Sequence, residues 1–285
     1  MPLIPLHIIW PDKKDELDTK YSDDPIKFYS TMQDFLDKRL GLPTTAQPSP
    51  KEFVEFYTTL YERGAREIGS VHIMASKSGT YNNAVLAASE VMKKHPDMKI
   101  LAMDSGALSL LQMFQAEIAM NELHNGASLE QINNILIKNI PFFHVALRTL
   151  DNAAAGGRVS NAKADLAEFL NMKPIVWLNK AELEIRQKAI GMKPALQRIV
   201  NNLRDEIDRK KALPSHVGTM YTCDRRTGDL LQKLLYKTLY ETLKKKEGII
   251  FEGPTEAGPL LGIHAGPGAA ALAALWADAS DTPHQ

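Results

Sequence analysis

The segment EIGSVHIMASKSGTYNNAVLAASEVMKKHPDMKILAM, residues 67–103, decides the fold class. Apolar runs at 67–74 and 99–103 each predict a strand. Between them, apolar residues at helical spacing over 81–94 predict a helix, which follows a Ser/Thr/Gly loop at 75–80. A strand, a helix and a second strand in this order form a βαβ unit, so we expect both strands to lie parallel in one sheet.

The same alternation extends over the first half of the chain. An Ile- and Leu-rich run at 3–10 predicts a short strand. A helix is expected from Pro50, because Ser49 is a candidate N-cap and Glu52 follows it by three residues. Further helices are predicted at 25–40, 108–125 and 128–139. Residues 1–148 are therefore predicted to form a parallel α/β domain.

The second half, residues 149–285, has a different pattern. Short strands are predicted at 142–147, 175–178, 182–188, 216–222, 249–251 and 260–264. Long helices are predicted at 192–211 and 227–246, whereas the stretch 153–157 interrupts the pattern and 269–274 is an Ala-rich tail. Short strands with two long helices predict an α+β domain with the helices packed on one sheet face. The fold class is therefore α/β, in two domains.

Composition excludes several functional classes. The 285 residues carry 34 Lys and Arg against 34 Asp and Glu, so nucleic acid is not expected as a main partner. No run of 18 apolar residues exists, so we expect no stable membrane insertion. The single Cys223 permits no internal disulfide, and the first residues do not resemble a secretory leader. The His residues lack metal-ligand spacing, so no metal site is expected. The cysteine count and the first residues lead us to expect a cytoplasmic protein.

The loop after the first strand of the βαβ unit is the first candidate site. In such sheets ligands bind beyond the carboxyl ends of the strands. There, Ser78 and Thr80 offer hydroxyl donors, Gly79 lets backbone come close, and the helix start offers N–H groups to an anion. The alternative is that Ser78 or Thr80 only caps the helix.

Three other segments hold candidate ligand contacts. The donors of Thr44-Thr45-Ala46-Gln47 lie between prolines that preorganise them, or form a plain connecting loop. Arg158 in a Gly-Gly-Arg loop faces an anion or is a solvated residue at a hinge, and His264 in a Gly/Pro turn faces a ligand or is structural. The glycines at 266–268 are too close to position 285 for a dinucleotide-binding βαβ unit, so no such cofactor is expected.

Six motifs occur together in one order. They are PTTAQPSP at 43–50, SGTY at 78–81, Asp104-Ser105, GGRVS at 156–160, KPI at 173–175 and GIHAGPG at 262–268. This series resembles the DegV family of fatty-acid-binding proteins over roughly residues 3–272. The resemblance implies two domains, with a long-chain acyl group lying in a cleft between them.

The resemblance also implies roles for individual residues. Those expected at the fatty-acid carboxylate are Thr45, Ser78, Gly79, Thr80 and His264. Arg158 and Gln47 are expected to contact the head group or a partner. Proteins of this family present the acyl carboxylate to a separate fatty-acid kinase, so the resemblance implies a carrier with no catalytic residue and no cofactor.

The chain departs from the family pattern in places. The family usually opens with a strand ending in Thr-Asp-Ser ahead of the segment 3–10, and this sequence is expected to lack it. Ala46 and Ala265 stand where serine and threonine are common.

The alternative function is a hydrolase or acyltransferase, with Ser78 as nucleophile, His264 as base and Asp104 as its orienting carboxylate.

Overall fold

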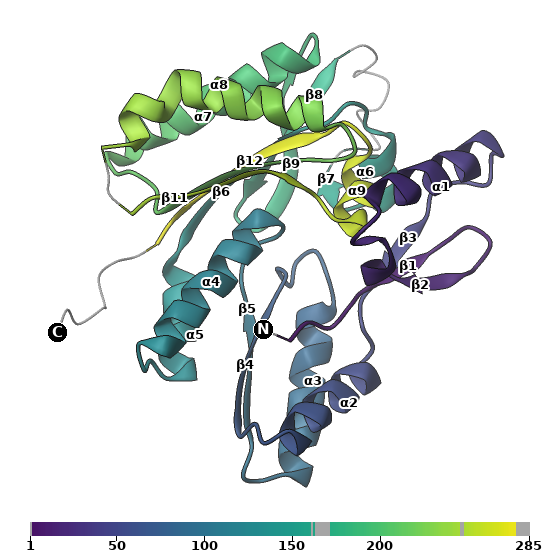
Figure 1. Cartoon of the computed structure of the whole chain (residues 1–285), viewed down its shortest axis with the longest axis vertical. Coiled ribbons are helices and arrows are strands. Elements are labelled where there is room, and N and C mark those ends of the chain that lie inside the picture. Colours follow the sequence, from purple (N-terminus) through teal and green to yellow (C-terminus); the bar gives the residue numbers. More distant parts are fainter. Residues whose placement is uncertain (1, 161, 163–171, 246–247, 278–285) are drawn as a thin grey trace. The chain divides into compact units, whose positions relative to one another are not determined.

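The computed structural model describes residues 2–160, 162, 172–245 and 248–277 (Figure 1). Its contacts divide into two compact units. Unit 1 contains the described residues of 1–7, 46–139 and 277–285, and unit 2 contains those of 8–45 and 140–276. The domain boundary expected at residue 148 stays a prediction.

Unit 1 contains the βαβ unit that the sequence predicts. Strands β4 (Glu67–His72) and β5 (Lys99–Asp104) pair in parallel, from Glu67 opposite Lys99 to His72 opposite Asp104. Helix α3 (Thr80–Lys94) connects them. The other helices of the unit are α2 (Pro50–Glu62), α4 (Leu110–His124) and α5 (Leu129–Lys138).

The core of unit 1 lies where α2 and α3 pack together. Phe53 and Tyr57 of α2 are fully buried against Ala84, Ala87 and Ala88 of α3. Small alanine side chains let the aromatic rings approach the α3 backbone closely. The predicted helix start is confirmed, because Ser49 and Glu52 form a complete capping box.

Unit 2 is built on a sheet with the strand order β11-β10-β12-β6-β8-β9-β7 (Figure 1). Its strands are β6 (Ile140–Ala146), β7 (Val159–Ser160), β8 (Lys173–Asn179), β9 (Glu182–Ala189), β10 (His216–Tyr221), β11 (Ile250–Glu256) and β12 (Ala270–Trp276). Helices α7 (Met192–Lys210) and α8 (Arg225–Leu243) share one apolar core with the sheet. The predicted α+β arrangement, with helices on one sheet face, is confirmed.

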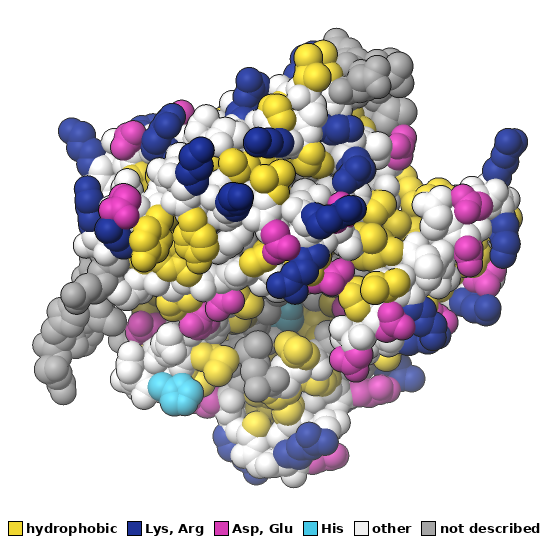
Figure 2. All heavy atoms as spheres, turned by 45° about the horizontal axis from the view of Figure 1, so that its top comes forward, with side chains coloured by type: hydrophobic (Ala, Val, Ile, Leu, Met, Phe, Trp, Pro, Cys, Tyr) yellow, Lys and Arg dark blue, Asp and Glu magenta, His cyan; other side chains and the backbone are white. Residues whose placement is uncertain are grey.

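The outward face of these helices is polar. Exposed residues of α8 include Lys233 and Lys237, and the exposed Lys244 is the C-cap of the helix. Figure 2 shows Lys and Arg side chains spread over this face, with acidic and apolar side chains between them. The buried stripe of each helix therefore packs on the sheet and its other side is solvated, as expected of an amphipathic surface helix.

Three expectations for the second half are wrong. The Ala-rich stretch is no tail but forms most of β12, a central strand buried on both faces, where small side chains suit close packing. Residues 260–264 are helical, in α9 (Pro259–Ala265), because Pro259 begins a helix and a short apolar run does not distinguish helix from strand. The interruption at 153–157 is mostly helix α6 (Asp151–Gly156).

The early part of the chain adds a small three-stranded sheet. Its strand order is β2-β1-β3, with β1 at His7–Ile9, β2 at Asp15–Leu17 and β3 at Thr44–Ala46. Two helices lie between β2 and β3 along the chain: the short 3-10 helix η1 (Asp18–Tyr21) and α1 (Pro25–Asp37). In unit 2, Trp10, Tyr21, Phe28 and Tyr29 form an aromatic cluster with Ile263 of α9. This cluster supports the helix that carries His264.

Candidate functional site

The loop before α3 carries a pair of hydroxyl groups. Oγ of Ser78 and Oγ1 of Thr80 are 2.7 Å apart, and the Thr80 backbone N–H donates to Ser78 Oγ over 3.3 Å. The N-cap residue of α3 is Gly79, so the helix begins without a side-chain cap. The first turn of a helix leaves N–H groups without intrahelical partners, and this loop therefore suits an anion.

Gln47 reaches the same loop within unit 1. A Cβ placed on Gly79 would lie 2.6 Å from Nε2 of Gln47, so the amide lies directly over the glycine. Beside it, Nδ2 of Asn83 donates to the Pro48 carbonyl over 2.8 Å. The structure thus brings Gln47, Ser78, Gly79 and Thr80 together.

A chain of hydrogen bonds among Tyr57, Ser70 and His72 lies at the carboxyl end of β4 and was not predicted from the sequence. The Tyr57 hydroxyl donates to Ser70 Oγ over 2.9 Å, which leaves the Ser70 proton for Nε2 of His72, 2.8 Å away. Burial lowers the pKa of His72 to about 4, although Asp104 acts in the opposite direction. His72 is therefore neutral near pH 7. Tyr57 lies in α2, 13 positions before Ser70, so no local pattern indicates the whole chain, although Ser70 and His72 are only two positions apart in β4.

In unit 2 the predicted residues Thr45 and His264 form a hydrogen bond. Thr45 Oγ1 and His264 Nε2 are 3.0 Å apart, although 219 positions separate the residues. Burial, and after it the charge of Arg158, lowers the pKa of His264 to about 4. The imidazole is therefore neutral near pH 7, and it acts by hydrogen bonding rather than as a counter-ion.

Arg158 is exposed beside this pair. Its Nη1 donates to the Gly156 carbonyl over 2.7 Å, which holds the guanidinium near the end of α6. The structure thus brings Thr45, His264 and Arg158 together in unit 2. Along the chain, only Ala46 separates Thr45 of this group from Gln47 of the unit 1 group.

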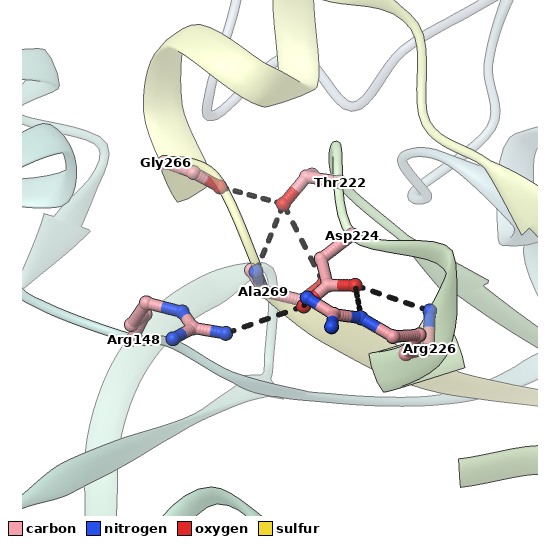
Figure 3. A network of polar contacts seen from close by, with 6 residues as sticks. All are labelled: Arg148, Thr222, Asp224, Arg226, Gly266 and Ala269. Atoms are coloured by element: carbon pink, nitrogen blue, oxygen red, sulfur yellow. Dashed lines mark hydrogen bonds and ion pairs between the residues drawn. The ribbon is translucent and has the colours of Figure 1, made fainter. Parts of the chain in front are cut away.

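The loop that follows His264 is fastened by Thr222 (Figure 3). The Thr222 hydroxyl donates to the Gly266 carbonyl over 2.6 Å and accepts from the Ala269 N–H over 2.9 Å. Gly266 and Gly268 have φ values of +74° and +75°, which side chains rarely adopt. Gly266 and Gly268 of the GIHAGPG motif therefore permit a tight turn at the end of α9.

Charged side chains flank the same loop. Asp224 pairs with Arg226, with 2.9 Å between Oδ1 and Nε, and with Arg148 at 3.6 Å (Figure 3). A Cβ on Gly268 would overlap the Arg148 guanidinium. Arg148 therefore packs directly on the turn.

The hydrogen bonds of the three alternative catalytic residues lead elsewhere. Ser78 pairs with Thr80, and His264 Nε2 pairs with Thr45. The Asp104 carboxylate accepts the backbone N–H groups of Ala75 and Gly106, so it fixes its own loop. Each of the three residues therefore has hydrogen-bond partners within its own unit.

The described part of the chain offers neither a metal site nor a membrane-spanning helix. Within it, no three His, Cys, Asp or Glu side chains gather where they could hold a metal ion. Among the helices of the same residues, none has the length and apolar character that crossing a membrane requires.

Comparison with known proteins agrees with the motif series. The profile of a family described as "Uncharacterised protein, DegV family" matches residues 1–276. A curated protein of Thermotoga maritima named "Fatty acid-binding protein" is 28% identical over 275 residues, which are 93% of this chain and 87% of that protein.

Solved structures share the fold. A stearic acid-binding protein from Eubacterium ventriosum superposes with a TM-score of 0.81 at 20% identity, covering 96% of this chain and 90% of that one. A DegV family protein from Eubacterium eligens, loaded with heptadecanoic acid, gives 0.75 at 24% identity, covering 96% and 92%. The two-unit architecture is therefore that of these proteins.

Proposed function

Because this chain belongs to the DegV family, we propose that it binds a long-chain fatty acid in the cytoplasm and presents the carboxylate to a partner fatty-acid kinase. One observation carries the proposal: neutral donors gather at two predicted places, around the Thr45–His264 pair and around the Ser78–Thr80 pair. The name of the Thermotoga relative and the stearic acid and heptadecanoic acid of the two solved structures support a fatty acid as ligand.

In this proposal the hydroxyls of Thr45 and Ser78 donate to the carboxylate. Gly79, Thr80 and His264 complete its surroundings, and Gln47 and Arg158 lie at the edge, toward the head group or the kinase. A carboxylate removed from water needs several donors, since an unpaired buried charge is very costly. Donors of this kind also stabilise the ionised form of the acid.

The acyl chain supplies most of the affinity. Burial contributes about 0.8 kcal/mol per methylene, so a sixteen-carbon chain offers roughly 10 kcal/mol before ordering costs. The donors then orient the carboxylate. That the acyl chain lies between the two domains stays a prediction from the family resemblance.

The partner kinase would perform the chemistry. A carboxylate oxygen attacks the γ-phosphorus of ATP, the bond from that phosphorus to the bridging oxygen breaks, and acyl phosphate and ADP result. The carrier contributes orientation and exclusion of water, and none of its side chains transfers a proton or phosphoryl group.

Native mass spectrometry tests the binding. Protein purified from a lipid-replete host should carry a mass excess equal to that of a fatty acid. The double variant Thr45→Ala/Ser78→Ala removes two donors to a charged group and should retain oleate at least about tenfold less well. Repeated recovery of the lipid-free wild-type protein would count against fatty-acid binding.

The matched control is Ser30→Ala/Thr59→Ala. Both hydroxyls are exposed and donate within their own helices, Ser30 to the Lys27 carbonyl and Thr59 to the Glu55 carbonyl. Oleate retention should therefore not change. Equal retention in the test and control variants would mean that the carboxylate lies elsewhere.

A second assay separates carrier from enzyme. With ATP and a fatty-acid kinase added, the oleate-loaded protein should yield acyl phosphate. Turnover of an activated acyl ester without the kinase, abolished by Ser78→Ala, would instead favour the hydrolase.

A further inference from the structure

We infer that Asn152 and Gly156 of α6 form a packing surface for His264, here called its seat. The two are positioning residues that aim the His264 Nε2 at Thr45. The inference rests on the proposed function for its consequence, since it concerns how the head-group donors are oriented. Asn152 and Gly156 are four positions apart, so they lie on one face of α6. Helices α6 and α9 both belong to unit 2.

Asn152 replaces a hydrogen bond that α9 cannot make for itself. The Ile263 carbonyl would be paired with the N–H of residue 267 in a longer helix, but that residue is Pro267. Nδ2 of Asn152 donates to this carbonyl over 2.9 Å, and both residues are buried. The bond fixes the peptide immediately before His264.

The other side of the Asn152 amide fits the turn after the histidine. A Cβ on Gly266 would lie 2.8 Å from Oδ1 of Asn152. One side chain therefore contacts the chain on both sides of His264. Loss of the amide would leave the Ile263 carbonyl buried without its donor, which is costly.

Gly156 determines how closely the imidazole can approach α6. A Cβ on this glycine would overlap Nδ1 of His264 and lie 3.2 Å from Cε1. Nδ1 is buried and has no hydrogen-bond partner among the described residues. Packing against Gly156, not a second hydrogen bond, thus determines the orientation of the ring.

This seat also determines which nitrogen carries the proton. A proton on Nδ1 would be a buried donor without an acceptor in the described part of the chain. A proton on Nε2 donates to Thr45 Oγ1, 3.0 Å away. The Thr45 hydroxyl is then free to donate onward to a carboxylate, so α6 makes Thr45 a donor.

Imidazole ¹⁵N NMR of the ligand-free protein tests the seat without requiring lipid binding. The wild-type protein should show His264 protonated at Nε2. Gly156→Ala should give a mixture of tautomers, shift the His264 pKa toward its ordinary value and weaken oleate retention about tenfold. Ala155→Gly, on the exposed side of α6, lowers helix propensity without contacting the ring and should leave the His264 spectrum unchanged.

Asn152→Ala provides a second variant if Gly156→Ala does not fold, and it should produce the same spectral change. A wild-type proton on Nδ1, or a wild-type-like spectrum in a folded variant, would overturn the inference. A changed spectrum in a protein that never binds oleate would support the seat and refute the proposed function.

Discussion

The two groups of head-group donors are built in different ways. In unit 1, the Ser78–Thr80 pair is local, since its hydrogen bonds span two positions. In unit 2, the Thr45–His264 bond spans 219 positions and the Asn152–Ile263 bond spans 111. A local loop keeps its geometry through its own sequence, whereas the second group depends on the complete packing of its unit. Changes in unit 2 should therefore be more damaging than equivalent changes in unit 1.

Acid should reveal the largest difference. Burial lowers the pKa of His144 in unit 2 to about 3, whereas in the unfolded chain it has its ordinary value. Between pH 6.5 and 4 the unfolded state binds a proton that the folded state refuses, so the free energy of unfolding falls by about 3 kcal/mol. We expect His144→Gln to flatten this dependence, measured by urea unfolding at several pH values.

His72 is the comparison residue in unit 1. Its pKa is lowered to about 4, and Asp104 opposes the effect of burial. His72→Gln should therefore flatten the pH profile less than His144→Gln does. An equal or greater flattening would contradict the ranking of the two units.

Adding one methyl group at matched glycines should give the next largest effect. A Cβ on Gly262 would overlap the Tyr29 hydroxyl, whose ring is held in the aromatic cluster, so Gly262→Ala should cost about 2 kcal/mol. The same change at Gly79 meets the exposed end of Gln47, which can move, and should cost less than about 1 kcal/mol.

Separate signals make this comparison feasible. Trp10, Trp177 and Trp276 all lie in unit 2, so tryptophan emission reports its unfolding. Far-UV circular dichroism reports both units. A larger loss for Gly79→Ala than for Gly262→Ala would reverse our conclusion about where packing is less tolerant.

Two capping boxes allow a smaller and more selective test within unit 1. Ser49 and Ser128 begin α2 and α5 with the same backbone angles and 3.3 Å cap bonds. Each change to alanine should cost about 1 kcal/mol in thermal or urea unfolding. Only Ser49→Ala should also weaken oleate retention, because Ser49 fixes the end of the loop that holds Gln47. Equal retention in both variants would show that this cap does not affect the site.

The smallest effect is expected for Arg226, an exposed residue near the turn at 266–268 in unit 2. The Arg226 side chain is 90% exposed, whereas that of its ion-pair partner Asp224 is 24% exposed. Arg226→Gln should leave thermal stability and oleate retention unchanged, because exposed ion pairs contribute little. A clear loss in either measurement would extend the long-range network to the surface.

The sequence predicts the local features well. Hydrophobic periodicity and turn residues predicted the βαβ unit, the start of α2 and the long helices α7 and α8. They could not predict β12, because alanine has low strand propensity and only burial on both faces explains its use there. Asn152 and Thr222 act across more than 40 positions, so no spacing in the sequence indicates them. The glycine pair at 156–157 was the available signal, since glycine permits close approach.

The place of β12 also affects how the chain folds during translation. β12 leaves the ribosome after every other strand of its sheet, yet it pairs with both β10 and β6. Until then those two strands have unpaired edges, which favour association with other chains. Residues 46–139 of unit 1 form one continuous stretch and can fold while synthesis continues. The nascent chain therefore passes through a stage in which residues 46–139 can already be folded while the sheet of unit 2 still needs a chaperone or its missing central strand.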